Sequence, residues 1–362
     1  MVLALAAAAE SPVPADAEIR KILTERVETY RQSAGIVVGV VEPSGHRMVS
    51  AGVIDKSDTR TMDGDTVFEI GSITKVFTAL LLTDMVERGE VKLDDPITKY
   101  LPAEVKVPQH GDRPITLADL ATHTSGLPRI PGNLTAKDPA NPYADYTAAR
   151  LYDFLASYKP VRDPGAQWEY SNLGTGLLGH ILALRAGVDF ETLVRTRITQ
   201  PLKMQNTGIA LSPTMKARMA VGHNVSLAVV PAWDFQVLAG AGALRSTAND
   251  MDSFLDATLG YTKTPLAKAM AAMLAVRRPI KAPDAEQALG WHIIHRAGRE
   301  LVWKDGGTYG FGTFIGFDPQ AKVGVAVLAN AFVIGDGQAS VDDIGLHLLD
   351  AAFPLTAPAK DK

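Results

Sequence analysis

Ser72 and Lys75 have the types and the spacing of a nucleophile and its base. They lie in the stretch EIGSITK, residues 69–75, which leads into an apolar run with helical spacing. A helix that begins there would place both side chains on one face, one turn apart. A serine hydroxyl becomes nucleophilic when a neighbouring base takes its proton, and a partly desolvated lysine can be that base. The alternative is structural, with Ser72 as the helix cap and Lys75 as a solvated residue of the first turn.

A second candidate combines a phenol and an amide, at Tyr170 and Asn172. Trp168 precedes them, and a Gly-rich apolar helix is expected from residue 173. A tyrosine close to lysines has a lowered pKa and can pass protons to and from a leaving group, while the Asn172 amide can hold a substrate carbonyl. The structural alternative is a helix start, in which Ser171 or Asn172 is the N-cap and Tyr170 packs between two lobes.

The third candidate is the run Lys304, Asp305, Gly306 and Gly307, which follows an expected strand at residues 301–303. Glycines there let the backbone approach a ligand closely. The N–H of Gly307 and that of Ser72, at its helix start, could together stabilise an oxyanion. The structural alternative is a Gly-rich hairpin with an exposed lysine.

Length and composition exclude several classes of protein. The chain has 362 residues, of which 46% are hydrophobic and 21% charged, and no cysteine. At about 150 residues per domain this suggests one large compact body or two packed lobes, and the composition excludes intrinsic disorder. The lack of cysteine excludes disulfides, thiolate nucleophiles and zinc ribbons. A net charge of −4 is too small to drive binding to nucleic acid or anionic lipid, so nucleic acid is not an expected partner.

Two further features concern location and assembly. No apolar run is long enough to span a bilayer. Residues 1–10, MVLALAAAAE, are similar to the hydrophobic half of a secretory signal with a small-residue cleavage site, although a charged n-region is missing. We therefore expect a periplasmic or secreted protein, with a cytoplasmic one as the alternative. The sequence leaves the oligomeric state open.

The apolar pattern predicts the elements that must position the three candidates. Near the N-terminus it indicates one amphipathic helix at residues 15–30 and a buried hairpin at 35–41 and 48–54. The middle of the chain, residues 72–235, is expected to form helices separated by Pro and Gly loops. Near the C-terminus the pattern indicates strands at 301–303, 312–317 and 323–329, followed by a last helix with Val341, Ile344 and Leu348 on one face. We therefore predict an α+β fold with a discontinuous sheet domain of residues 15–71 and 236–354 and an inserted, mainly helical domain of residues 72–235. The cleft between the two lobes is the natural place for a site.

Other possible sites are not supported. His123 belongs to a Ser/Thr/Gly turn and is expected to order that loop. His292 and His295 lie in a strand-like stretch, and their spacing sends the two rings to opposite faces, which argues against a metal site. No Gly-x-Ser-x-Gly occurs, so an α/β-hydrolase nucleophile is not indicated, and residues 306–308 lack the spacing of a phosphate loop.

Taken together, the three candidates occur in the order found in the penicillin-recognising serine hydrolases. The chain resembles the group of class C β-lactamases, D-alanyl-D-alanine peptidases and family VIII carboxylesterases in its Ser-x-x-Lys at 72–75, Tyr-x-Asn at 170–172 and Lys-x-Gly at 304–306. The stretches HTSGLP at 123–128 and LDDP at 93–96 extend the resemblance over most of residues 15–350. It implies an antiparallel sheet flanked by the terminal helices, with an inserted all-helical lobe.

The resemblance also implies roles for the candidate residues. Ser72 would be acylated, Lys75 and Tyr170 would handle protons, and no metal or organic cofactor would be needed. Asn172 and Lys304 would bind substrate and tune Tyr170, and Gly306 of the same triplet would also belong to the substrate-binding residues. The N–H groups of Ser72 and Gly307 would form the oxyanion hole.

Asp305 departs from the β-lactamase pattern, because Thr or Ser commonly occupies its position and binds the substrate carboxylate. Two like charges about 4 Å apart cost about 4 kcal/mol at an effective dielectric near 20. Either Asp305 pairs with Lys304 or another cation, or the preferred substrate lacks a carboxylate at that point.

We therefore predict a serine hydrolase that acts through an acyl-enzyme on a small-molecule substrate, and we expect it first of all to hydrolyse the amide bond of β-lactams. Carboxylesterase and D-alanyl-D-alanine carboxypeptidase activities are the close alternatives. A non-catalytic ligand-binding relative is a rival of another class, because fold alone does not determine function.

Overall fold

A nine-stranded antiparallel sheet forms the centre of the computed structural model, which describes residues 13–331 and 340–356. Its strand order is β3-β2-β1-β11-β10-β9-β8-β7-β6, so the first and last strands of the chain meet in its middle. The strands are β1 (Gly35–Glu42), β2 (Gly45–Asp55), β3 (Asp58–Thr61), β6 (Arg278–Pro279), β7 (Ala285–Gln287), β8 (His292–Arg296), β9 (Arg299–Gly307), β10 (Gly312–Asp318) and β11 (Val323–Ala329). A separate two-stranded ladder joins β4 (Phe68–Glu69) to β5 (Arg245–Ser246).

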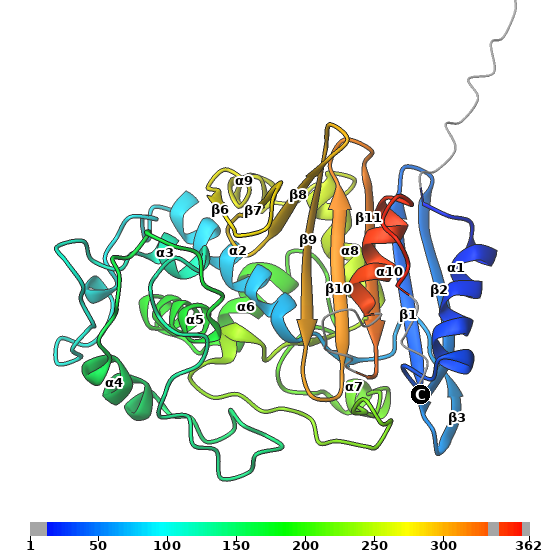
Figure 1. Cartoon of the computed structure of the whole chain (residues 1–362), viewed down its shortest axis with the longest axis horizontal. Helices are drawn as coiled ribbons and strands as arrows, with labels where there is room; N and C mark the ends of the chain where they lie inside the picture. The colour runs from blue at the N-terminus through cyan, green and yellow to red at the C-terminus, as the bar shows by residue number, and fades with distance from the viewer. Residues whose placement is uncertain (1–12, 332–339, 357–362) are drawn as a thin grey trace, which may run out of the picture.

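Helices from the two ends of the chain cover one face of the sheet (Figure 1). They are α1 (Asp16–Thr24) and α10 (Val341–Leu349), which pack on β2, β10 and β11. Successive strand residues point to opposite faces, so Ile36, Val38 and Val40 of β1 enter this core while Val37 and Val41 enter the other one. A strand buried on both faces explains the continuous β-branched run at residues 35–41.

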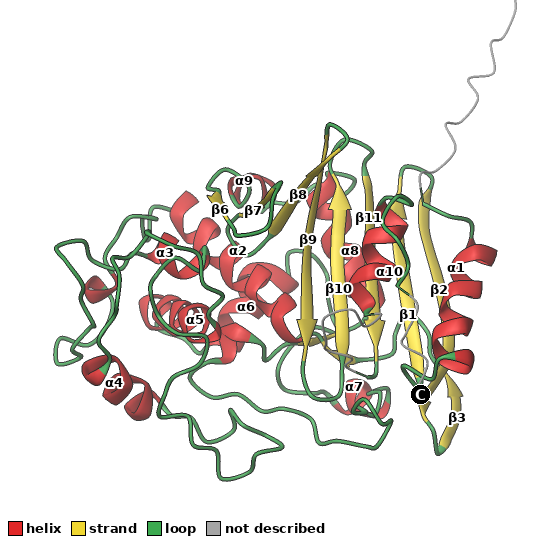
Figure 2. Cartoon of the chain, in the orientation of Figure 1, coloured by secondary structure: helices red, strands yellow, loops and turns green. Residues whose placement is uncertain are grey.

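The opposite face packs on α8 and continues into the helical lobe. Figure 2 shows the sheet at one end of the molecule and most helices at the other. The helices on this side are α2 (Thr74–Glu87), α3 (Leu117–Ala121), α4 (Ala148–Ser157), α5 (Asn172–Ala186), α6 (Phe190–Val194), α8 (Ala248–Leu259) and α9 (Ala267–Ala272), whereas the short α7 (Pro213–Ala217) contributes no residue to their core. One continuous apolar core runs from the sheet into these helices, so the two lobes are packed together.

The fold class predicted from the sequence is confirmed, with two local corrections. The expected helix at residues 15–30 is split into α1 and a short π-helix, Glu25–Thr29. The sequence placed Lys304 and the residues after it beyond the end of a strand. In the structure Lys304, Asp305, Gly306 and Gly307 belong to that strand, β9. The domain boundaries at residues 72 and 235 stay a prediction. Residues 1–10, with the expected signal segment, lie outside the described residues, and no helix within 13–331 and 340–356 is long and apolar enough to cross a membrane.

A buried carboxyl group under the sheet is not explained by the fold. Asp252 of α8 is 2% exposed, and both of its carboxyl oxygens lack a hydrogen-bond partner within the described part of the chain. It lies against Gly39 of β1, where a Cβ would come within 2.2 Å of the Asp252 Oδ1 atom, so a glycine is required there. Burial, with a smaller repulsion from Asp256, raises the pKa of Asp252 well above its usual range.

Replacing Asp252 by asparagine is therefore expected to stabilise the protein more at pH 8 than at pH 5. The folded chain keeps a proton that the unfolded chain loses above the ordinary aspartate pKa, so the free energy of unfolding falls as the pH rises from that value towards the raised one. Within this window each pH unit costs the wild type about 1.4 kcal/mol, and the amide has no such cost. Urea unfolding of wild type, Asp252→Asn and the exposed control Asp153→Asn at both pH values measures the effect. An equal gain at both pH values would show that Asp252 is ionised in the folded state.

Candidate active site

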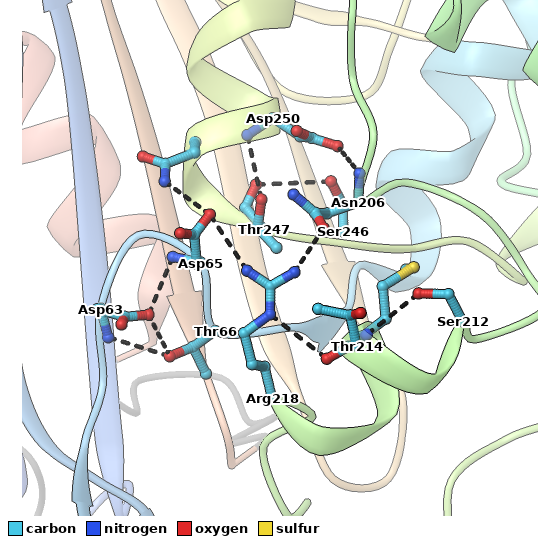
Figure 3. A network of polar contacts seen from close by, with 12 residues as sticks. Asp63, Asp65, Thr66, Asn206, Ser212, Thr214, Arg218, Ser246, Thr247 and Asp250 are labelled. Atoms are coloured by element: carbon cyan, nitrogen blue, oxygen red, sulfur yellow. Dashed lines mark hydrogen bonds and ion pairs between the residues drawn. The ribbon is translucent and has the colours of Figure 1, made fainter.

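A polar network lies next to the loop that leads into β4 and towards Ser72 (Figure 3). Arg218 donates to Asn206 Oδ1 at 2.6 Å and lies 3.5 Å from the Asp65 carboxylate. Asp250, in the first turn of α8, accepts a hydrogen bond from the Asn206 backbone N–H, and its own N–H donates to the capping hydroxyl of Thr247. The network thus joins the loop before β4, the segment before α7 and the start of α8.

Ser72 lies in a single 3₁₀ turn, Gly71–Ile73, that leads from β4 into α2. Gly71 has φ +49°, and a Cβ on it would come within 2.5 Å of the Gly307 backbone nitrogen. Only glycine meets both conditions without strain. This close approach places the backbone of Ser72 beside the end of β9, as an oxyanion hole formed by Ser72 and Gly307 requires.

The Ser72 hydroxyl is the meeting point of the predicted proton-handling residues. Lys75 Nζ donates to Ser72 Oγ at 2.9 Å, and Tyr170 OH donates to the same oxygen at 2.8 Å. Lys75 is 1% exposed and also donates to the Ala241 carbonyl at 2.6 Å. The structural alternative for this pair is wrong, because the N-cap of α2 is Ile73 and Lys75 is not solvated.

The loop that carries Tyr170 is fixed by His123 and Ser171. Ser171 caps α5, accepting a hydrogen bond from the Gly174 N–H, and its own N–H donates to His123 Nδ1 at 3.2 Å. The His123 ring packs on Tyr170 with 4.6 Å between ring centroids. Burial, together with repulsion from Lys75, lowers the pKa of His123 well below its usual range, so the ring is neutral. The sequence predicted that His123 orders its own turn, whereas these contacts hold the loop that carries Tyr170.

Cations surround the Tyr170 ring. The Nζ atoms of Lys75 and Lys304 lie 5.1 and 5.2 Å from its centroid, and the Arg129 guanidinium carbon lies at 5.0 Å. Burial raises the pKa of Tyr170, but the two ammonium groups outweigh it, and the pKa ends below its ordinary value. Burial also lowers the pKa of Lys75. Both members of the pair therefore lose a proton more readily than free side chains do.

Asp305 pairs with Lys304, one of the two possibilities that the sequence left open. Its Oδ1 lies 2.6 Å from Lys304 Nζ, while 41% of its side chain is exposed. Burial alone would raise the pKa of Asp305, but Lys304 outweighs it and lowers that pKa. In turn, burial lowers the pKa of Lys304 while Asp305 and Tyr170 raise it, and the net shift is upwards. Lys304 therefore stays charged beside Tyr170.

The end of β9 presents a free edge to the site. Pairing between β8 and β9 stops at His292 and Trp303, so within the described residues no strand covers that side of residues 304–307. A Cβ on Gly306 would come within 2.1 Å of the Ile70 carbonyl oxygen, so this strand packs directly on the stretch of residues 69–75 that contains Ser72. Such an edge can hydrogen-bond an extended substrate through its backbone.

Asn172 is the first residue of α5 and faces an aromatic neighbour. Its amide nitrogen donates to the Tyr143 hydroxyl at 3.3 Å, and its Oδ1 atom is buried without a partner in the part of the chain that is described. The arrangement leaves the carbonyl oxygen of Asn172 available to a ligand group.

Sequence reasoning missed two residues that support the site, the buried Glu69 and the half-buried His292. Glu69 accepts hydrogen bonds from the Trp233 N–H and the Thr308 hydroxyl, both at 2.8 Å, and pairs with Arg245. Burial raises its pKa although Arg245 opposes the shift. Glu69 thereby ties the start of the stretch 69–75 to Thr308, the residue after Gly307. Its place in that stretch was the only signal of this role in the sequence.

The second missed residue is His292. The predicted opposite orientation of the two histidines is confirmed, since His292 Nε2 lies 3.5 Å from Lys304 Nζ whereas His295 contacts Glu286 and Glu300. Burial lowers the pKa of His292 to about 3, so it is a neutral neighbour of Lys304. Within the described ranges no group of three or more His, Cys, Asp or Glu side chains is placed to hold a metal ion.

Comparison with known proteins supports the resemblance seen in the sequence. The β-lactamase family model matches residues 19–348. The chain is 32% identical over 277 residues to the D-alanyl-D-alanine-carboxypeptidase/endopeptidase AmpH of Escherichia coli K12, which covers 73% of this chain and 71% of AmpH. It is 29% identical over 347 residues to a β-lactamase of the same organism, covering 86% and 88% of the two chains.

A solved structure agrees with these relatives. The class C β-lactamase from Rhodobacter sphaeroides superposes with a TM-score of 0.76 at 28% identity, covering 88% of this chain and 95% of the other. The family match spans most of the chain and includes all three candidate motifs. The chain therefore belongs to the β-lactamase family and is a serine hydrolase.

Proposed function

We propose that this protein hydrolyses amide or ester bonds through an acyl-enzyme on Ser72, and that β-lactams are its first substrate class. The observation that carries the proposal is the double hydrogen bond to Ser72 Oγ from Lys75 and Tyr170. A serine that meets two groups of lowered pKa has a route for its proton. The β-lactamases among its relatives support the choice of substrate.

The reaction has two halves. Ser72 Oγ attacks the carbonyl carbon and its proton passes to the Lys75 and Tyr170 pair, while the N–H groups of Ser72 and Gly307 stabilise the oxyanion. The carbon–nitrogen bond then breaks, and Tyr170 gives a proton to the departing nitrogen. Water then attacks the acyl-enzyme, and the pair takes a proton from that water. The bond between the acyl carbon and Ser72 Oγ breaks, and the pair passes this proton to Ser72 Oγ as the acid is released. In an ester the departing atom is oxygen.

The nearest alternative is D-alanyl-D-alanine carboxypeptidase activity, which the name of the AmpH relative supports. Carboxylesterase activity follows, because Asp305 disfavours a carboxylate at the strand edge. A catalytically silent relative is the remaining rival, and the three intact motifs argue against it.

A fluorophosphonate probe followed by intact mass measurement tests the proposal. We expect one probe per chain, because an activated serine labels stoichiometrically. A panel of nitrophenyl esters, β-lactams and D-Ala-D-Ala peptides then ranks the substrate classes by kcat/KM. A chain that neither labels nor turns over any member of the panel would be a binding protein, and the proposal would fail.

We also propose that the protein acts in the periplasm or after secretion, on the basis of the apolar residues 1–10. Fractionation of cells that express the full chain, with intact mass of the recovered protein, tests this. Uncleaved protein in the cytoplasmic fraction would contradict it.

Replacing Asp305 by threonine is expected to raise kcat/KM for anionic β-lactams by about ten- to a hundredfold. The change removes a negative charge from the strand edge and frees Lys304, now paired at 2.6 Å, to meet a substrate anion. Neutral nitrophenyl esters are expected to respond little.

The measurement compares both substrate types at two salt concentrations, since an electrostatic effect at an open position shrinks with screening. Asp153→Asn, an exposed charge removal elsewhere, is the control. Equal responses of charged and neutral substrates would show that Asp305 does not act on the substrate through its charge.

A further inference from the structure

Arg129 lies at the rim of the site, anchored to the loop that carries Tyr170. Its backbone carbonyl accepts hydrogen bonds from the N–H groups of Asn172 and Leu173 at 2.9 and 3.3 Å. Its guanidinium carbon lies 5.0 Å from the centroid of the Tyr170 ring. Tyr170 in turn contacts Ser72, so a small substrate that acylates Ser72 is within reach of this guanidinium.

Among the described residues, the guanidinium of Arg129 has no carboxylate partner and contacts only the face of the Tyr170 ring. The residue is exposed, and in residues 13–331 and 340–356 no carboxylate lies within 4.0 Å of its guanidinium and no side-chain hydrogen bond forms from it. Lys304 and Lys75 differ, because Lys304 is paired with Asp305 and Lys75 donates to Ser72 and Ala241. An unpaired guanidinium offers donors in a planar fork that matches a carboxylate.

The strand edge at Lys304 and Asp305 therefore differs in charge from the region around Arg129. At the strand edge Asp305 already occupies Lys304, and its exposed carboxylate repels an incoming anion. At Arg129, which also lies over the Tyr170 ring, the charge is positive and no carboxylate of the described residues pairs with it. A substrate anion is thus disfavoured at the strand and favoured at Arg129.

We propose that Arg129 binds a carboxylate on the leaving-group part of the substrate, replacing the strand edge in this role. The inference rests on the proposed function, because Tyr170 protonates the leaving group and Arg129 lies over Tyr170. It assigns a substrate class, acyl compounds whose leaving group carries a carboxylate. This carboxylate belongs to a β-lactam or to the C-terminus of a D-alanyl peptide.

Matched pairs of substrates test the proposal. They are benzylpenicillin with its methyl ester, and N-acetyl-D-Ala-D-Ala with its C-terminal amide. In each pair the measured quantity is the ratio of kcat/KM for the acid to kcat/KM for the neutral compound. Arg129→Gln is expected to lower this ratio by about ten- to a hundredfold, the scale for losing a hydrogen bond to a charged group. The pair that responds identifies the source of the carboxylate.

Three controls make the result specific. Arg195→Gln removes an exposed arginine elsewhere and should leave the ratio at its wild-type value. Arg129→Lys keeps the charge without the fork, so it should restore part of the ratio. In the wild type the ratio should fall as salt is added. This salt series tests the proposal even if Arg129→Gln does not fold.

The outcomes separate this inference from the proposed function. If the wild type hydrolyses the substrates but Arg129→Gln leaves both ratios unchanged, the inference is wrong and the proposed function stands. If nothing is hydrolysed, the proposed function fails. Calorimetric binding of benzylpenicillin and its methyl ester to Ser72→Ala, with and without Arg129→Gln, then decides the inference, and equal binding of acid and ester would overturn it.

Discussion

Replacing Ser72 by alanine is expected to abolish turnover, with a loss of several orders of magnitude, and to abolish labelling by a fluorophosphonate. The melting temperature should hardly change. The Ser72 hydroxyl caps no helix, and its hydrogen-bond donors are Lys75 and Tyr170. Lys75 keeps its hydrogen bond to the Ala241 carbonyl in the variant, so the buried ammonium group is not left without a partner.

The test uses an activated nitrophenyl ester, intact mass after labelling, and thermal unfolding of the same samples. Ser157→Ala is a matched control, because Ser157 is an exposed serine at the end of α4 and distant from the three motifs. If Ser72→Ala labels or hydrolyses the ester as the wild type does, another residue is the nucleophile.

Much of the fold could be predicted because each pattern has one structural solution. The β-branched run at residues 35–41 is buried on both faces, and this forces helices onto both sides of β1. The central position of β1 beside β11 follows once both ends of the chain contribute strands to one sheet. The splitting of the first helix could not be predicted, because its π-turn leaves the apolar spacing nearly unchanged.

The site was predictable only as far as its residues lie in short motifs. Lys75, Tyr170 and Lys304 were found in this way. Their electrostatic setting was not, because it depends on contacts between residues far apart in the chain. The Ala241 carbonyl meets Lys75 across 166 positions, and Glu69 meets Thr308 across 239. Such partners have no local pattern that a single sequence can reveal.

The positions of the cations explain why the phenol and the amine must be treated as one unit. Lys304 is held in its charged form by Asp305, and its charge lowers the pKa of Tyr170. The charge of Lys75 acts on Tyr170 in the same direction. Tyr170 in turn opposes the loss of the proton from Lys75, because a tyrosinate stabilises the ammonium form. A proton removed from Ser72 is therefore shared by the pair.

Changing Lys75 to methionine or Tyr170 to phenylalanine is expected to cost several orders of magnitude in kcat/KM, and the double change little more than either single one. Each variant removes one end of the hydrogen-bonded group at Ser72 Oγ, after which the other end has no complete path for the proton. Residues that act as a unit give losses that do not add.

The pH profile gives a second, independent sign of the coupling. In the wild type, activity should rise with pH through a value below the ordinary tyrosine pKa of 10.0, because the lowered pKa lets the pair lose its proton earlier. In Lys75→Met the positive charge that favours tyrosinate is gone, so the residual activity should rise at higher pH than in the wild type. Additive losses in the double variant, together with an unchanged profile in Lys75→Met, would show that Lys75 and Tyr170 act independently and that the shared-proton mechanism is wrong.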